Sequence, residues 1–211
     1  ESREMVGHGV VELVVYAPDH PGLFAAIAGA MALSAVNIVD AKVHTLTDGM
    51  ALDTFVIQKA SGGGFNLTSD FSRVRKRIAD AIQGKMRPAH ELAKRREQTK
   101  ERSAEIFTVA PIAIIDNNVS NTHTVIEING RDRAGLLYDV TSVITGDGLQ
   151  ISSALVSTYG ERVVDVFYVK DVFGLKVERK ERIDGLRDKL LLSIAEDTKT
   201  GEMVDQQPAA E

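Results

Sequence analysis

The strongest constraint on the fold is an internal repeat. "YAPDHPGLFAAIAGAM", which starts at Tyr16, and "NGRDRAGLLYDVTSVI", which starts at Asn129, share one pattern, with Asp19 of the first matching Asp132 of the second. At this offset of 113 residues the match continues, and one residue drops out of the second copy at a turn. The matched positions include Gly22 with Gly135, Leu23 with Leu136, Asn37 with Gln150, Ala41 with Ala154, and Asp53-Thr54-Phe55 with Asp165-Val166-Phe167. Such a tandem repeat predicts two units with the same architecture.

Within the first copy, hydrophobic periodicity predicts a strand, a helix, a hairpin and a second helix. Residues 10–16 are apolar and β-branched, as in a buried strand, and apolar residues recur at helical spacing in residues 23–31. Residues 36–59 alternate as two strands around an Asp-Gly turn, which is a strong hairpin signal. Residues 71–82 then carry the apolar stripe of a second helix.

The second copy repeats this order, and the order indicates the fold class. Its predicted elements are a strand at 124–129, a helix at 136–144, a hairpin at 150–169 and a helix at 178–195. This order, followed by a last strand, is that of a ferredoxin-like βαββαβ unit. We therefore expect an α+β protein with two tandem ferredoxin-like units, each with an antiparallel sheet.

A last strand is predicted for the first unit only. Residues 106–115 form an apolar run interrupted by Pro111, and we expect them to hold that strand. No comparable run follows the last helix of the second copy, so its sheet either lacks a final strand or borrows one. The predicted divisions are a first unit at residues 10–116, which includes a charged segment at 85–102 and the strand at 106–115, a second unit at 122–196, and a polar tail at 197–211.

Composition excludes several classes of protein. Of the 211 residues 44% are hydrophobic, which allows a buried core, and the net charge of −5 gives no general attraction to nucleic acid. Charges interrupt every apolar stretch well before the roughly 18 residues of a membrane-spanning helix. The absence of cysteine excludes disulfides and thiolate zinc sites. The start, "ESREMVGHG", shows no secretory signal and no recognisable initiation region, so we expect a cytoplasmic protein and a piece cut from a longer chain.

The charged segment at residues 85–102 has two interpretations. Basic residues outnumber acidic ones there, and the sequence favours a helix. It is either a patch that binds anions or nucleic acid, or a solvated helical extension that links the two units. The second interpretation is favoured, because charge-dense helices are usually solvated.

The corner between the first strand and the first helix of each unit is the candidate binding site. A helix N-terminus has unpaired backbone N–H groups and a partial positive charge, which suit a carboxylate. Gly22 and Gly135 lack a Cβ atom, so a small ligand can approach the backbone closely at both corners.

Acidic and amide side chains add to both corners. Asp19 and Asp132 can accept hydrogen bonds from an ammonium group, and Asn37 and Gln150, which open the next strands, can bond a polar ligand end. Together these groups describe a site for a free amino acid. Structural alternatives remain open: the aspartates can cap helices, the glycines can relieve the corner, and the amides can satisfy strand ends.

Catalytic and RNA-binding motifs are weak by comparison. No Asp-x-Asp pair is present for a magnesium-dependent nucleotidyl transfer, and Lys94 stands where the second histidine of a His-Glu-x-x-His motif beginning at His90 would be. We therefore assign no catalytic residue and no metal ligand. RNA-binding sheets of the same order stack bases on aromatic residues. Phe55, Phe167 and Tyr168 lie on the third strands without the basic-aromatic signature, so RNA binding is the less favoured interpretation.

The two repeats resemble a known family. "DHPGLFAAIAGAMALSAVNIVDAKVHTLTDGMALDTFVIQ" and "NGRDRAGLLYDVTSVITGDGLQISSALVSTYGERVVDVFYVKD" are similar to tandem ACT domains, in particular to the C-terminal pair of the bacterial bifunctional uridylyltransferase/uridylyl-removing enzymes. The resemblance covers about residues 10–196. The binding residues of the family correspond here to Asp19, Pro21, Gly22, Leu23 and Asn37, and to Asp132, Gly135, Leu136 and Gln150. The second copy departs from the family pattern at Ala134, where proline is usual.

This resemblance implies a regulatory function. It implies that the chain senses glutamine and shifts a larger enzyme from uridylyl transfer to uridylyl removal on the PII signal protein. The nucleotidyltransferase and hydrolase domains of that enzyme would lie elsewhere, with magnesium or another divalent metal as cofactor, and this chain would need none. The ACT sheets could also form a homo-oligomer. The alternative interpretation is a structural dimerisation module without a ligand.

Overall fold

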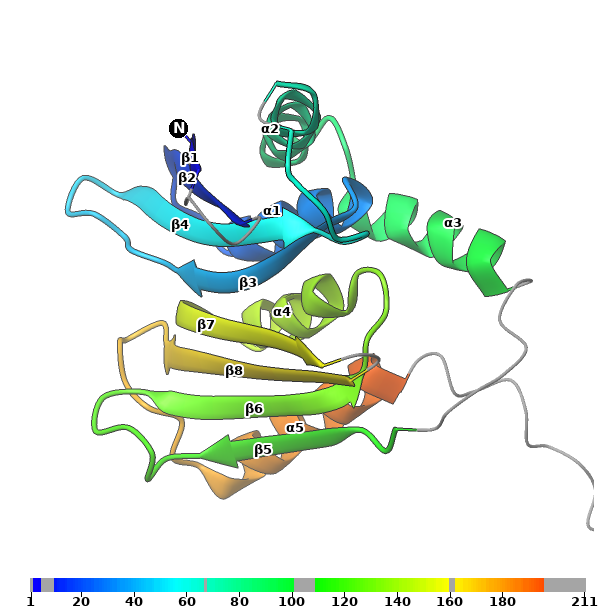
Figure 1. Cartoon of the computed structure of the whole chain (residues 1–211). Helices are drawn as coiled ribbons and strands as arrows, with labels where there is room; N and C mark the ends of the chain where they lie inside the picture. The colour runs from blue at the N-terminus through cyan, green and yellow to red at the C-terminus, as the bar shows by residue number, and fades with distance from the viewer. Residues whose placement is uncertain (1, 5–9, 67, 101–108, 160–161, 196–211) are drawn as a thin grey trace, which may run out of the picture.

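The computed structural model describes residues 2–4, 10–66, 68–100, 109–159 and 162–195 (Figure 1). The first unit comprises β1 (Ser2–Glu4), β2 (Val10–Pro18), α1 (Leu23–Leu33), β3 (Val36–Lys42), β4 (Met50–Lys59) and α2 (Ser69–Ile82). The second unit comprises β5 (Ile112–Asp116), β6 (Thr124–Arg131), α4 (Leu136–Gly146), β7 (Leu149–Tyr159), β8 (Arg162–Asp171) and α5 (Lys180–Ala195), and α3 (Pro88–Lys100) lies between the units in sequence. The strands of this described part form one antiparallel sheet in the order β1-β2-β4-β3-β7-β8-β6-β5.

The helices cover the buried face of this sheet. Along β4, Ala51, Asp53, Phe55 and Ile57 are buried while the residues between them are partly exposed, and β8 alternates in the same way. Because successive side chains of a strand point to opposite faces, one face of the sheet packs into the core with α1, α2, α4 and α5. The α+β class, the two ferredoxin-like units and both predicted hairpins are confirmed.

The two units join edge to edge through β3 and β7. Ala41 lies opposite Ala154, and the neighbouring pairs are Asp40 with Leu155 and Lys42 with Ser153. Since Ala41 and Ala154 are equivalent positions of the repeat, this register relates the units by a local two-fold axis, as in a symmetric dimer. One edge of each unit's sheet is therefore paired within the chain (Figure 1).

The last strand is placed differently from the prediction. β5 pairs with β6 of the second unit, and β1 takes the equivalent position beside β2 in the first unit. The turn from β5 to β6 is short, and Asn117 Oδ1 within it accepts a hydrogen bond from Thr124 Oγ1 at 2.7 Å. Pairing with β6 thus closes a small loop, which costs less entropy than returning past α3 to β2. The predicted assignment of the last strand to the first unit is therefore wrong for the described strand at 112–116, and so is the start of the second unit at residue 122. Residues 106–108 and the tail at 197–211 lie outside the described residues.

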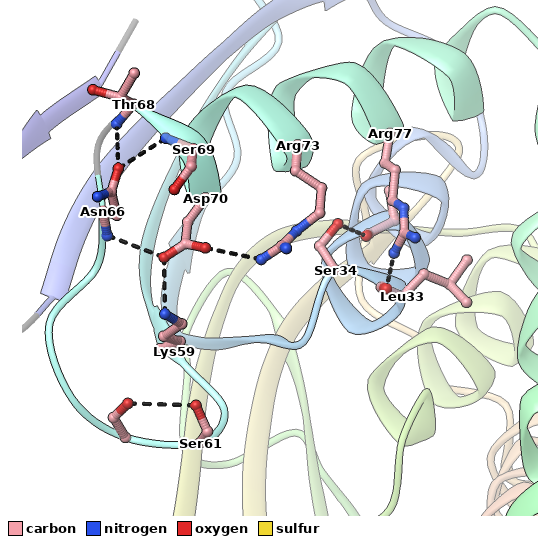
Figure 2. A network of polar contacts seen from close by, with 12 residues as sticks. Leu33, Ser34, Lys59, Ser61, Asn66, Thr68, Ser69, Asp70, Arg73 and Arg77 are labelled. Carbon is pink, nitrogen blue, oxygen red and sulfur yellow. Dashed lines mark hydrogen bonds and ion pairs between the residues drawn. The ribbon is translucent and has the colours of Figure 1, made fainter.

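The start of α2 is held by side chains that the sequence places just before and within its first turn (Figure 2). Asn66 Oδ1 accepts hydrogen bonds from the backbone N–H groups of Thr68 at 3.0 Å and Ser69 at 2.8 Å. The backbone N–H of Asn66 in turn donates to Asp70 Oδ2 at 3.1 Å, and Lys59 Nζ lies 3.0 Å from the same oxygen. The Asn66 hydrogen bond and then the Lys59 contact lower the pKa of Asp70.

The C-terminal end of α1 is an attachment point for two other helices. Arg77 of α2 donates to the carbonyl oxygen of Leu33 (Figure 2). Arg95 Nη1 of α3 donates to the carbonyl oxygens of Ala32 at 3.2 Å and Leu33 at 3.5 Å. Because the last carbonyls of a helix lack intrahelical partners and carry partial negative charge, two guanidinium groups stabilise this end and fix α2 and α3 against the first unit.

Candidate functional site

The loop that leads into the first helix has the same backbone conformation in both units. Gly22 precedes α1 with a φ angle of 89°, and Gly135 precedes α4 with a φ angle of 83°. These angles lie in the left-handed region, where any residue with a Cβ atom is strained. The turn itself therefore requires both glycines, whether or not a ligand binds there.

Neither corner aspartate caps the helix that follows it. Asp19 Oδ2 accepts a hydrogen bond from Thr45 Oγ1 at 2.6 Å instead. Much of the Asp132 side chain reaches solvent, yet desolvation raises the pKa of its carboxyl, and a backbone hydrogen bond from Arg133 opposes the rise. Helix capping thus does not explain why the aspartate is repeated.

The space around the two corner glycines differs. A Cβ atom at Gly22 would meet nothing within 4 Å. A Cβ atom at Gly135 would lie 2.9 Å from Leu92 Cδ1 and 2.8 Å from Arg96 Nη2. The second corner is therefore covered by α3, while the first corner is open.

Two residues of α3 hold this cover in place. Leu92 is only 1% exposed, and both of its methyl carbons lie beside Gly135. Arg96 donates from Nε to the carbonyl oxygen of Ala134 at 3.3 Å and from Nη2 to Asp139 Oδ2 at 2.6 Å. The predicted helix is confirmed, but it is a bridge between the units and not a wholly solvated extension. Its arginines serve contacts within the chain, which weakens the interpretation as a nucleic-acid patch.

A cavity of about 250 Å³ lies between the two units, beside the second corner. Asn37 of β3 lines it together with Asp132, Gly135 and Leu136 of the second corner. The structure therefore brings together an amide from one unit and an acidic corner from the other. Sequence reasoning placed the corner residues correctly along the chain, but it paired each corner with the amide of its own unit.

The remaining predicted residues do not line this cavity. Asp19, Pro21 and Gly22 lie in the corner of the first unit, and Leu23 is buried in the core at the start of α1. Gln150 is exposed at the start of β7. The local two-fold axis relates Asn37 to Gln150, and the second corner to the first corner. The two amides are therefore equivalent by symmetry, but they have different surroundings.

Sequence reasoning missed a buried acid at this site. Asp165 of β8 also lines the cavity and is 2% exposed, and among the described residues its Oδ1 has no hydrogen-bond partner. Its repeat equivalent, Asp53 of β4, is 1% exposed and also has an unpartnered Oδ1. The available signal was the alternation of the third strands: both aspartates stand two residues before a core phenylalanine, where an apolar residue is expected.

Burial changes the protonation of these two acids. The pKa of Asp165 is raised to about 7, mainly by desolvation; a hydrogen bond from the Ser157 backbone opposes the rise and the charge of Asp132 adds to it. Desolvation likewise raises the pKa of Asp53 to about 7, with a backbone hydrogen bond from His44 opposing and the charge of Asp19 contributing. Both carboxyls therefore exchange protons near neutral pH, far above ordinary aspartate.

The charged groups of the cavity have both signs. Arg95 of α3 and Arg133 of the second corner lie in its wall with Asp132 and Asp165. Arg133 Nη1 lies 2.6 Å from Asp139 Oδ2, which it shares with Arg96, so the corner is held in one arrangement. A wall with acids, guanidinium groups and an amide can bind a small molecule that carries both charges.

The described residues contain no group of three or more His, Asp or Glu side chains that could hold a metal ion. No helix in the same part of the chain has the length and apolar character needed to cross a membrane.

The chain is similar to one family of domains and to part of several larger enzymes. Residues 119–196 match the profile of the ACR family N-terminal ACT domain. The bifunctional uridylyltransferase/uridylyl-removing enzyme of Azospirillum brasilense is 48% identical over 191 residues, which are 90% of this chain and 20% of that enzyme. The enzymes of the same name from Gluconobacter oxydans and Rhodospirillum rubrum are 47% and 48% identical over 92% and 89% of this chain, again 20% of each. Residues 119–196 are thus similar to an ACT domain, and the chain spans about one fifth of the length of the bifunctional enzymes that it matches.

Proposed function

We propose that this chain is the amino-acid-sensing region of a bifunctional uridylyltransferase/uridylyl-removing enzyme, and that the ligand is glutamine. In this proposal glutamine shifts the larger enzyme from uridylyl transfer to uridylyl removal on the PII signal protein. The observation that carries it is the cavity between the two units, which combines an amide, two acids and two guanidinium groups in about 250 Å³. The homology with enzymes of that name supports the same assignment.

The chemistry of the wall matches each polar group of a free amino acid such as glutamine. The α-carboxylate requires positive charge, which Arg95 and Arg133 supply. The ammonium group requires acceptors, which are present as Asp132 and Asp165. The side-chain amide can exchange two hydrogen bonds with the amide of Asn37, since each is both donor and acceptor.

The position of the cavity supports regulation, because its walls belong to both units and to α3. A ligand shifts a conformational equilibrium only if it binds one state more tightly than another. A ligand between α1, β3 and the second corner changes the fit of the units to each other, and α3 contacts both of them. Couplings of this kind are typically about 1–3 kcal/mol, or roughly 5- to 150-fold in affinity.

The catalytic work is assigned to parts of the larger enzyme outside these 211 residues, with magnesium or another divalent metal there and a cytoplasmic location for the whole. The isolated chain should then neither add nor remove uridylyl groups on the PII protein. The full enzyme without this region should retain some of its chemistry and lose its response to glutamine. A truncated enzyme that still switches across a glutamine series would place the sensor elsewhere.

The direct test is calorimetric titration of the chain with the twenty amino acids. Glutamine at about 100 times its dissociation constant should also stabilise the folded chain by about 2.7 kcal/mol. Asn37→Ala should weaken glutamine binding, while Gln150→Ala, at the symmetry-related position outside the described cavity, should not. If no amino acid binds and none raises the unfolding temperature, the chain is better explained as a structural dimerisation module.

A further inference from the structure

Asp165 is a buried acid whose hydrogen bonds are incomplete. Its carboxyl is 2% exposed, and only one oxygen has a partner, through the backbone N–H of Ser157. The other oxygen, Oδ1, is buried and has no partner within the part of the chain that the structure describes. Buried polar atoms in folded proteins are nearly always bonded, so an exception of this kind requires an explanation.

Neither protonation state of Asp165 removes the problem. The ionised carboxylate needs a donor for Oδ1, and the neutral acid needs an acceptor for its O–H group. Leaving a buried polar group unsatisfied is costly, and leaving a buried charge unpaired costs more. A bound group that brings both hydrogen-bond donors and positive charge satisfies Oδ1.

The surroundings of Asp165 indicate which donor fits. The charged groups that line the cavity with it are Asp132 and Arg133 from the corner before α4 and Arg95 from α3, while the lining residues of β3 and β7 are uncharged. Asp132 and Asp165 are close enough to repel each other electrostatically. A primary ammonium group carries three N–H donors and one positive charge, so it can bond both carboxylates and offset their repulsion.

We propose that Asp165, together with Asp132, is the subsite for the protonated amine of the ligand in the cavity between the units. This inference rests on the proposed function for the location of the ligand, and it assigns to Asp165 the selection of ligands that carry an amine. Amines enter because they complete the bonds of Asp165, and analogues without the amine are rejected because they leave Oδ1 unsatisfied. Uptake of the amine requires the ionised carboxylate, so it releases the proton of Asp165 below neutral pH.

The repeat supplies a matched control. Asp53 has the same place in its strand, the same degree of burial and the same unpartnered Oδ1. It does not line the described cavity. Asp53→Asn and Asp165→Asn therefore remove the same charge from equivalent positions of the fold, and only Asp165→Asn changes this ligand site.

The experiment is calorimetric titration of the full chain and both variants with L-glutamine and with glutaramate, which is glutamine without its α-amino group. Wild type should bind glutamine more than about 100-fold more tightly than glutaramate, because the buried acceptor discriminates against a ligand without a donor. Asp165→Asn should weaken glutamine about 10- to 150-fold, the usual range for a hydrogen bond to a charged group. It should affect glutaramate far less, and Asp53→Asn should leave both affinities within about twofold.

A second measurement detects the proton directly. Repeating the glutamine titration in two buffers of different ionisation enthalpy gives the number of protons released on binding. Wild type and Asp53→Asn should release nearly one proton at pH 6 and far less at pH 8, and Asp165→Asn should release almost none at either pH. A role of Asp165 in folding alone would not change this count.

The outcomes separate the two proposals. If glutamine binds wild type and Asp165→Asn equally, or glutaramate binds as well as glutamine, the amine subsite is refuted while glutamine sensing survives. If glutamine does not bind but another amino acid or methylammonium does, and Asp165→Asn abolishes that binding, glutamine sensing is refuted and the amine subsite stands. If no amino acid and no simple amine binds wild type, both are refuted.

Discussion

Replacing the corner glycines by alanine should distinguish the stability lost through the backbone conformation of the turn from the stability lost through contact with α3. Gly22 and Gly135 have nearly the same positive φ angle, 89° and 83°. The left-handed conformation costs a residue with a Cβ atom about 1–2 kcal/mol, so both substitutions share this loss of stability. Gly22→Ala should lose no more, because its Cβ atom would meet nothing within 4 Å.

Gly135→Ala should lower the free energy of unfolding more than Gly22→Ala does. Its Cβ atom would lie 2.9 Å and 3.0 Å from the two methyl carbons of Leu92, which is 1% exposed. Overpacking of a core by one methyl group typically costs about 1–3 kcal/mol. We therefore expect a total loss of about 2–5 kcal/mol for Gly135→Ala, against about 1–2 kcal/mol for Gly22→Ala.

Urea unfolding of the two single variants measures this difference, and a double-mutant cycle tests its cause. Leu92→Ala should partly relieve Gly135→Ala, with a coupling of at least about 1 kcal/mol, and should be additive with Gly22→Ala. Equal losses for the two glycine variants, or additivity of Gly135→Ala with Leu92→Ala, would refute the conclusion that α3 packs on the second corner.

Two further predictions concern the buried acids and the helix crossing. The pKa values of Asp53 and Asp165 rise from 3.8 to about 7 on folding, so between these pH values the unfolded chain binds fewer protons than the folded chain. The free energy of unfolding should therefore fall as pH rises from about 4 to 7, by up to about 4 kcal/mol per acid. Urea unfolding across this pH range checks it, and each Asp→Asn variant should flatten the profile; a stability that rises through the window contradicts the assignment. Gly29→Ala should destabilise the chain by about 1–3 kcal/mol, because the new Cβ atom would lie 2.5 Å from Pro88 Cβ and 2.8 Å from Tyr138 Cδ2. Thermal unfolding tests this, and an unchanged midpoint would show that α1, α3 and α4 can move apart at Gly29 without loss of stability.

The repeat was sufficient to predict the local structure of each unit. The alternation of apolar and polar residues in 36–59 and 150–169 predicts strands with one buried face, since successive side chains of a strand point to opposite faces. The glycine at each corner could also be read as a turn residue, because the chain passes directly from an apolar strand to an apolar helix. These inferences needed only neighbouring residues, and the structure agrees with them.

Pairings between distant segments could not be predicted in the same way. Residues 112–116 are apolar enough to pair with either unit, and the short turn before Thr124 decides for the second. The charge of α3 suggested a solvated helix, yet Leu92 and Arg96 place it against the second corner. Local composition does not specify a partner surface, so these outcomes depend on the assembled fold.

The candidate site shows the same division. The sequence determined that each unit carries an aspartate, a glycine and an amide in a fixed order, because the repeat preserves them. Only the tertiary structure decided that Asn37 lines one cavity with Asp132 of the other unit, since that arrangement depends on the register of β3 against β7. The same assembly made Asp165 a buried acid beside the cavity, and burial, which no single strand possesses by itself, sets its pKa and its need for a partner.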